Sequence, residues 1–247
     1  MCRHLVYLGP PVPLSRLLFE PAHSLAHQSW APADMRGGGT INADGFGVGW
    51  YAEGGPVRYR RATPLWSDTT LPGLASAVSA GAVLAAVRSA TIGMPVTEHA
   101  AAPFGEGPWL FSHNGKVSGW PGSVAKLAAT LPPVDLLTLD APTDAALLWA
   151  FVRDRLRGGA GPREAVADTI AEVAAAAPGS RLNLLLTDGE TVVASTYGHS
   201  LSVLRRAGSV LVSSEPLDDD PSWQPVDDRT LVVATAAELQ QIPLGES

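Results

Sequence analysis

Short apolar runs that end in turn residues recur along this chain. Three pairs of them flank tight turns: 48–53 and 56–62 around Gly54-Gly55, 181–187 and 190–196 around Asp188-Gly189, and 201–206 and 209–214 around Ala207-Gly208. Glycine pairs and Asp-Gly between β-type runs are typical of hairpin turns. Further runs at 5–8, 82–88, 108–115 and 229–235 predict additional strands. Because hairpins join antiparallel neighbours, the pattern predicts largely antiparallel sheets.

Helical periodicity interrupts the strand pattern. A helix is predicted over 144–157, with Thr143 as its N-cap, and another over 162–177, which begins at Pro162. A shorter helix is predicted over 123–131. Strands before the helices and hairpins after them do not give a regular βαβ alternation, so the fold class is α+β, with the two longer helices covering a sheet face.

Composition and charge narrow the function classes. The chain has 247 residues, long enough for a sizeable core, and we expect one domain over 2–247. Its net charge of −7 argues against nucleic-acid or anionic-membrane partners. The longest apolar stretches, such as 80–87, fall short of the ~20 residues of a membrane span, and early prolines interrupt any signal-peptide core, so a cytoplasmic protein is expected.

Three segments without regular patterning also carry predictions. The stretch 20–43 reads as a long loop of the kind that often holds functional residues. The tail after Ala237 is expected to be loosely held. The acidic stretch 215–220 reads as a solvated loop.

Other motifs favour structural interpretations. The glycines of 45–49 lack the spacing of a dinucleotide-binding loop and are better explained by tight strand entry or close backbone approach. His23 and His27 lie four residues apart, as metal ligands on a helix do, but no H-E-x-x-H glutamate accompanies them. We therefore expect no metal site.

Cys2 is the single cysteine of the chain, which excludes an internal disulfide and a cysteine-rich metal site. A lone cysteine can be a small core residue. Alternatively, removal of Met1 would make Cys2 the first residue and place its thiol and α-amine on one carbon. A dyad of Cys2 with His4 or His113 is a further alternative that spacing alone leaves open.

Taken in order, the motifs resemble the class II (N-terminal nucleophile) glutamine amidotransferases. The resemblance rests on MCR at the start, NADGFGVGW at 42–50, VRSATIG at 87–93 with a following APF, and FSHNGKV at 111–117. TDAALL, NLLLTDGE and SSEP continue it to residue 216. The resemblance implies a four-layer αββα sandwich with two mainly antiparallel sheets, no cofactor and a small-molecule substrate.

The resemblance also implies roles for individual residues. Cys2 would be the nucleophile, with Asn114 and Gly115 donating hydrogen bonds to the oxyanion. Arg88 would bind the α-carboxylate of a glutamyl group, with a hydroxyl donated by Thr91. Asp144 would bind the α-ammonium of the same group.

MCRHLVYLG at the start, PAHSLAHQSWAP at 21–32 and NADGFGVGWY narrow the resemblance to the stand-alone amidohydrolases of ergothioneine biosynthesis. These enzymes cleave the γ-glutamyl amide of γ-glutamyl-hercynylcysteine sulfoxide. Ser89 and Ile92 depart from other family members, which commonly carry an aromatic residue and, in aminosugar-forming members, a histidine there. Trp30, Trp50 and Tyr51 are candidates to bind the leaving half, whose pocket stays unassigned. Two alternatives remain: a glutaminase that passes ammonia to a partner, and a binding protein with a degenerate site.

Overall fold

The strands form two antiparallel sheets. The structure, a computed structural model, describes residues 2–35 and 41–245. One sheet has seven strands in the order β11-β9-β10-β1-β4-β2-β3, namely β1 (Arg3–Pro13), β2 (Phe46–Ala52), β3 (Gly55–Arg61), β4 (Ser79–Val87), β9 (Ser202–Arg206), β10 (Ser209–Ser213) and β11 (Gln224–Pro225). The other has six strands in the order β13-β12-β8-β7-β6-β5, namely β5 (Phe104–Glu106), β6 (Trp109–Lys116), β7 (Arg181–Thr187), β8 (Val192–Thr196), β12 (Thr230–Ala234) and β13 (Leu239–Pro243).

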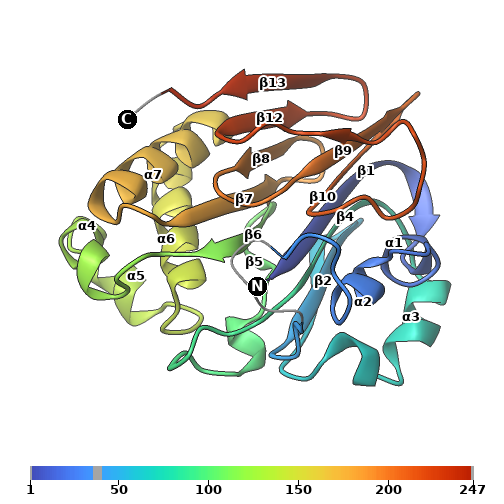
Figure 1. Cartoon of the computed structure of the whole chain (residues 1–247). Helices are drawn as coiled ribbons and strands as arrows, with labels where there is room; N and C mark the ends of the chain where they lie inside the picture. The colour runs from blue at the N-terminus through green and yellow to red at the C-terminus, as the bar shows by residue number, and fades with distance from the viewer. Residues whose placement is uncertain (1, 36–40, 246–247) are drawn as a thin grey trace.

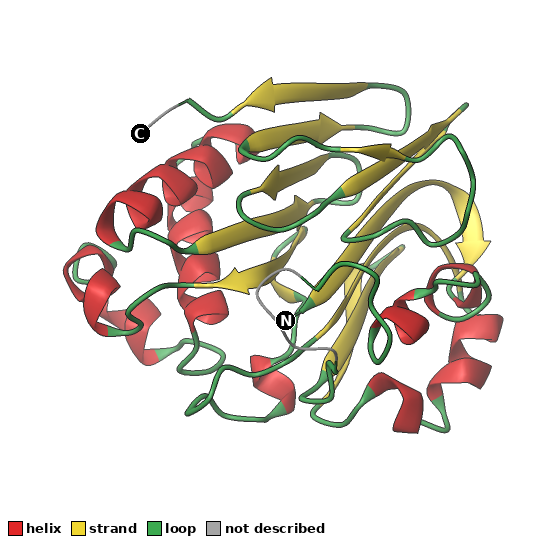
Figure 2. Ribbon diagram, viewed as in Figure 1, coloured by secondary structure: helices red, strands yellow, loops and turns green. Residues whose placement is uncertain are grey.

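Helices cover the outer face of each sheet (Figures 1 and 2). The long helices α6 (Asp144–Arg157) and α7 (Pro162–Ala176) pack on the six-stranded sheet. The short helices α1 (Ser15–Leu18), α2 (Leu25–Gln28) and α3 (Leu71–Ala77) pack on the seven-stranded sheet. The remaining helical segments are α4 (Ala125–Ala128), α5 (Pro133–Leu137) and the 3₁₀ turns Leu65–Ser67, Glu98–Ala100 and Gly122–Val124. The α+β class and the four-layer αββα sandwich are confirmed.

The inner strands are buried on both faces. On β1, Leu5 and Tyr7 face the helices, whereas Val6 and Leu8 face the other sheet. The same alternation holds along β4, which explains why its sequence at 82–88 is almost continuously apolar. Across the described ranges 2–35 and 41–245, the structure has no helix with the length and apolar character that a membrane crossing requires.

Most predicted elements are present. The three predicted hairpins form, with connections at 53–54, 188–191 and 207–208, so the first turn lies one residue before the predicted Gly54-Gly55. The helix over 144–157 has the predicted bounds. Thr143 caps that helix, since its hydroxyl accepts a hydrogen bond from the N–H of Ala146 at 3.2 Å. Sequence patterns missed the short helices α1 to α3 and α5 and the strands β5, β11 and β13, because each is too short to show a clear period.

Two expectations were wrong. The helix predicted over 123–131 is only α4, a single turn preceded by the 3₁₀ turn. Glycine and proline at 119–122 and Pro132-Pro133 leave too little chain for a longer helix. The tail after Ala237 is not loosely held. As far as residue 243 it is fixed in the six-stranded sheet, because β13 pairs with β12 along the sheet edge. The predicted loop 20–43 contains α2, and its residues 36–40 lie outside the described residues.

Candidate active site

Strand register brings Cys2 and Arg88 together. β1 and β4 pair antiparallel with Arg3 opposite Val87, so the next pair outward is Cys2 and Arg88. Cys2 is half-buried, and its Sγ lies 3.8 Å from the carbonyl oxygen of Ser89. The amino terminus of β1 lies where the two sheets approach one another (Figure 1). A thiol placed there can react with a ligand held between the sheets.

The space between the sheets changes from apolar to polar toward Cys2. In order toward Cys2, the side chains that face the other sheet are Leu8, Val6 and His4 on β1. On β6 they are Leu110, Ser112 and Asn114. His4 Nδ1 lies 3.1 Å from Ser112 Oγ, which joins the two sheets through a polar contact. The alternation that builds the core therefore also delivers polar side chains to one end of it.

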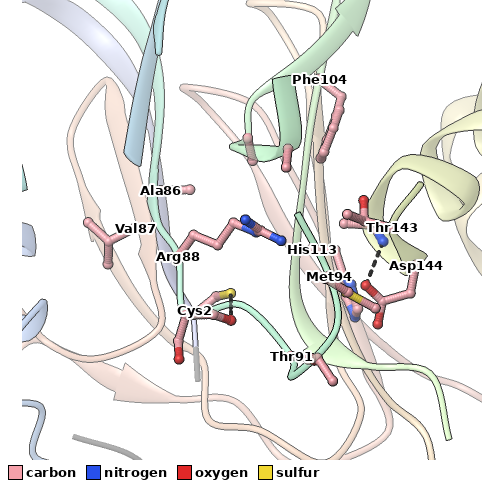
Figure 3. A pocket seen from close by; sticks show the side chains of 15 residues that line it. Cys2, Ala86, Val87, Arg88, Thr91, Met94, Phe104, His113, Thr143 and Asp144 are labelled. Atoms are coloured by element: carbon pink, nitrogen blue, oxygen red, sulfur yellow. Dashed lines mark hydrogen bonds between the residues drawn. The ribbon is translucent and has the colours of Figure 1, made fainter. Parts of the chain in front are cut away.

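One pocket collects most of the predicted site residues (Figure 3). Its lining includes Cys2, Arg88, Thr91, Gly115 and Asp144. The side chain of Arg88 reaches into the pocket from the end of β4, and that of Asp144 from the opposite side (Figure 3). The structure thus brings together residues that lie more than 140 positions apart in the sequence.

Arg88 is a buried cation with only backbone partners. Its side chain is 9% exposed, and Nη1 donates to the carbonyl oxygens of Pro95 at 2.9 Å and Asp44 at 3.4 Å. None of the ion pairs among residues 2–35 and 41–245 involves it. Because a buried charge without a counter-ion is costly, this guanidinium is suited to an anionic ligand.

The NADGF motif shapes the backbone around Arg88. The carboxylate of Asp44 accepts the N–H of Ala90 at 2.8 Å, and Asp44 N donates to Arg88 O at 2.9 Å. A Cβ on Gly47 would lie 2.2 Å from the carbonyl oxygen of Ala102. The interpretation of these glycines as sites of close backbone approach is confirmed.

Asp144 is the first residue of α6 and supplies the negative charge of the pocket. It is 6% exposed, and its carboxylate accepts the N–H groups of Val117 at 3.0 Å and Ala145 at 2.8 Å. A carboxylate has further lone pairs beyond these two bonds, so it can also accept from an ammonium group. Thr91 is exposed at the pocket rim.

Asn114 stands apart from the pocket lining. Its side chain is 1% exposed, and Nδ2 donates to Ser214 Oγ at 3.3 Å, which leaves its second N–H available. Within the described chain Oδ1 has no hydrogen-bond partner. The neighbouring Gly115 does line the pocket, and a Cβ there would lie 1.9 Å from Arg181 O. Glycine is required at this position because the backbone of the neighbouring strand β7 occupies the space of a side chain.

The histidines do not form a dyad with Cys2. Among residues 2–35 and 41–245, His4 Nδ1 is bound to Ser112, and His113 Nε2 lies 3.0 Å from Arg181 O. Burial, followed by the nearby histidines and Arg3, lowers the pKa of His4 well below its usual range. Burial and the charge of Arg181 lower the pKa of His199 to about 3. His4 and His199 are therefore neutral at pH 7.

These neutral histidines make stability depend on pH. An unfolded histidine binds its proton near pH ~6.5, whereas His199 in the folded protein does so only near 3. Between these values the unfolded state holds more protons, so stability falls as pH falls, by about 1.4 kcal/mol per pH unit per group. We expect His199→Gln to reduce the loss of unfolding free energy between pH 7 and pH 5 in urea titrations. The matched variant of the exposed His99, His99→Gln, retains the wild-type slope, and equal slopes in all three proteins would contradict this account.

Several sequence interpretations need correction or stay without support. Glu215 is not part of a solvated acidic loop, because it is 3% exposed and pairs with Arg3. His23 bonds to Glu215 rather than to a metal ligand set, and the described residues contain no metal-binding group of three or more His, Cys, Asp or Glu. Trp30, Trp50 and Tyr51 are absent from the lining of the Cys2 pocket.

Sequence reasoning assigned no role to Arg3, Asp44, Ser214 and Glu215. All four contact residues of the site or their neighbours. Each lies inside a motif that carries the family resemblance, and that was the available signal.

The family model described as glutamine amidotransferases class-II matches residues 22–209. The chain belongs to this family. This class II amidotransferase is 43% identical over 237 residues to a protein named gamma-glutamyl-hercynylcysteine sulfoxide hydrolase from Mycobacterium tuberculosis (strain CDC 1551 / Oshkosh), with 95% of this chain and 93% of the relative covered.

Two further relatives extend the comparison. A protein of the same name from Mycolicibacterium smegmatis is 41% identical over 245 residues, with 99% of the amidotransferase chain and 100% of the relative covered. A solved structure of a glutamine aminotransferase class-II domain protein from Silicibacter pomeroyi has a TM-score of 0.69 and 25% identity, with 99% of this chain and 100% of that chain covered. The resemblance read from the motifs is confirmed at the level of the family.

Proposed function

We propose that this protein hydrolyses the γ-glutamyl amide of γ-glutamyl-hercynylcysteine sulfoxide, as a single amidotransferase domain over residues 2–247. The observation that carries the proposal is the convergence of the Cys2 thiol, the Arg88 guanidinium and the Asp144 carboxylate on one pocket. A γ-glutamyl group presents an α-carboxylate, an α-ammonium and a γ-carbonyl. The charges of the pocket complement the first two groups, and the thiol is the nucleophile for the third.

Arg88 binds the α-carboxylate through two parallel N–H···O bonds, the geometry in which arginine recognises carboxylates. Asp144 binds the α-ammonium, and Thr91 donates its hydroxyl to the glutamyl group from the rim. Because both charged partners are buried, each ionic contact is stronger than it would be in water. The glutamyl end is thereby fixed while the γ-carbonyl meets Cys2.

The chemistry needs the α-amine of Cys2 to be free. Met1, whose removal frees it, lies outside the described residues, and we propose that it is removed. An α-amine titrates near 7.7–8.0 and a thiol near 8.5, so the amine can take the thiol proton close to neutral pH. Among the described residues the thiol contacts the carbonyl oxygen of Ser89, while His4 and His113 bond to Ser112 and Arg181, which favours the amine as the base.

The thiolate adds to the γ-carbonyl carbon, and the oxyanion accepts hydrogen bonds from the Asn114 amide and Gly115 N–H. Collapse of this intermediate breaks the C–N bond, and the amine of Cys2 returns the proton to the leaving nitrogen. Water then adds to the thioester, releasing glutamate and regenerating the thiol. No metal or cofactor takes part in these steps.

The names of the two mycobacterial relatives support the choice of the hercynylcysteine sulfoxide conjugate as substrate. The contacts assigned above bind the glutamyl group, and none of them is assigned to the leaving half of the substrate. We also place the reaction in the cytoplasm, with which a chain that has a single cysteine and no disulfide is compatible.

A substrate comparison tests the proposal. Glutamate release is measured from γ-glutamyl-hercynylcysteine sulfoxide and from glutamine, on protein whose intact mass shows the loss of one methionine. We expect a higher kcat/KM for the conjugate. A preference for glutamine would favour a glutaminase that passes ammonia to a partner. No release from either compound by the processed protein would favour a binding protein on the same scaffold.

A further inference from the structure

Arg3, the residue after Cys2, carries a charge deep inside the protein. Its side chain is 2% exposed, and within the described residues its guanidinium bonds to a carboxylate and to backbone oxygens. Nε donates to Glu215 Oε1 at 2.7 Å, and Nη1 donates to the carbonyl oxygen of Cys2 at 2.9 Å. Nη2 donates to the carbonyl oxygen of Asp34. The guanidinium thus links the backbone of Cys2 to two distant segments.

Glu215 is the centre of this arrangement. Its other oxygen, Oε2, lies 2.6 Å from His23 Nε2 and accepts the N–H of Ala33 at 2.8 Å, while Oε1 also accepts the N–H of Asp34 at 3.2 Å. Burial alone would raise the pKa of Glu215, but the hydrogen bond from His23, the charge of Arg3 and the N–H of Ala33 lower it to about 2. The carboxylate is therefore ionised at any pH at which the protein would work.

Cys2 itself has few other restraints. β1 begins at Arg3, so the Cys2 residue lies just outside the strand. The Sγ contact with Ser89 O, at 3.8 Å, is weak. After loss of Met1, one peptide bond would join Cys2 to the chain, so the position of its thiol and amine would depend on the contacts of its carbonyl oxygen and of Sγ. A misplacement of ~1 Å at a reacting group can cost ~10²-fold in rate.

We infer that Glu215 is a positioning residue, which acts through Arg3 to fix the carbonyl of Cys2 and, with it, the thiol and the α-amine of the nucleophile. The effect of Glu215 on glutamate release rests on the proposed function. Glu215 holds the Arg3 guanidinium in place by the ion pair, and the same guanidinium holds Cys2 by its hydrogen bond. Ser214, the neighbour of Glu215, contacts Asn114, so two consecutive residues after β10 support the nucleophile and the oxyanion donor.

A buried ion pair could equally serve folding alone, and the chain offers a matched control. Asp135 is 5% exposed and accepts from Arg153 and Arg157 at 2.9 Å each, on α5 and α6, in a cluster that shares no residue with the Cys2 pocket. Removing the charge of Glu215 takes from the buried Arg3 guanidinium the carboxylate with which it pairs, whereas Arg153 and Arg157 keep Glu106 at 3.6 and 2.6 Å. Glu215→Gln and Asp135→Asn both remove a buried carboxylate charge that binds arginine, and they differ in their connection to Cys2.

The experiment compares these variants at a temperature at which each is folded by circular dichroism. For Glu215→Gln we expect kcat to fall roughly 10-fold to 100-fold, which is the rate cost of a misplaced reacting group. We expect KM to change less than about 3-fold, because Arg88 and Asp144 are untouched. Asp135→Asn keeps the wild-type kcat. Retention of kcat by folded Glu215→Gln, or an equal loss in Asp135→Asn, would overturn the inference.

A second readout does not depend on turnover. Cys2 is the single cysteine of the chain, so iodoacetamide alkylation reports on it alone. In Glu215→Gln we expect the alkylation rate to move toward that of a short peptide that begins with the same sequence. Arg3→Lys keeps the charge but lacks the several hydrogen bonds of the guanidinium, so we expect it to change the alkylation rate in the same direction. It replaces Glu215→Gln in this test if Glu215→Gln does not fold.

The two readouts separate two kinds of failure. Unchanged alkylation in both variants would overturn the positioning role. Absent glutamate release by the wild-type protein, together with altered alkylation in the variants, would overturn the proposed function and leave the positioning role standing.

Discussion

Cys2→Ala is expected to abolish glutamate release while leaving the fold intact. Loss of a nucleophile that acts together with its base lowers kcat on the order of 10⁶-fold in hydrolases. The structural cost is small, since Cys2 is half-buried and its thiol makes one weak contact. Steady-state assays of the variant, with intact mass to verify that Met1 has been removed, measure the effect.

The same variant separates chemistry from binding. Because Arg88 and Asp144 remain, Cys2→Ala should bind the uncleaved conjugate with a dissociation constant close to the wild-type KM, as measured by titration calorimetry. Thermal unfolding near the wild-type temperature is the control for folding. Turnover at even a few percent of the wild-type rate would exclude Cys2 as the nucleophile.

Arg88→Gln is expected to weaken binding of the glutamyl group more than any other single change in the pocket. Removing one partner of a buried, hydrogen-bonded charge pair costs about 2–5 kcal/mol, which corresponds to roughly 30-fold to several-thousand-fold in KM. The effect falls on KM as well as kcat/KM, because the α-carboxylate is bound in the ground state and in the transition state alike. Initial rates over a wide range of conjugate concentrations measure it.

A second arginine provides the control for this substitution. Arg60 is also largely buried and bonds to a backbone carbonyl and to Asp140, but it does not line the pocket. Arg60→Gln should leave KM within about 2-fold of wild type. If Arg88→Gln had an unchanged KM, the α-carboxylate would have to be bound elsewhere.

Local patterns were sufficient for much of the fold. The hairpins predicted at Asp188-Gly189 and Gly54-Gly55 both form, because Gly189 and Gly55 adopt positive φ readily, although the first turn lies at Glu53-Gly54, one residue earlier than predicted. The helix over 144–157 was predictable because its cap, apolar period and terminal glycines agree. The edge strand β13 was not, since its sequence has no strong alternation and its pairing with β12 provides the order.

The motifs in chain order also determined the family and predicted most of the charged and reactive residues that line the pocket. What they could not determine is how residues far apart in the chain meet. Arg88 lies beside Cys2 because β1 and β4 pair in one register, which is set by the burial of alternate residues on both faces. Glu215 reads as an acidic loop residue in the sequence and becomes a buried partner of Arg3 only when β10 packs against β1. The sequence by itself thus determined the chemistry that is available. Tertiary packing alone decided which charges lose water and which groups hold the nucleophile, because both depend on contacts between distant strands.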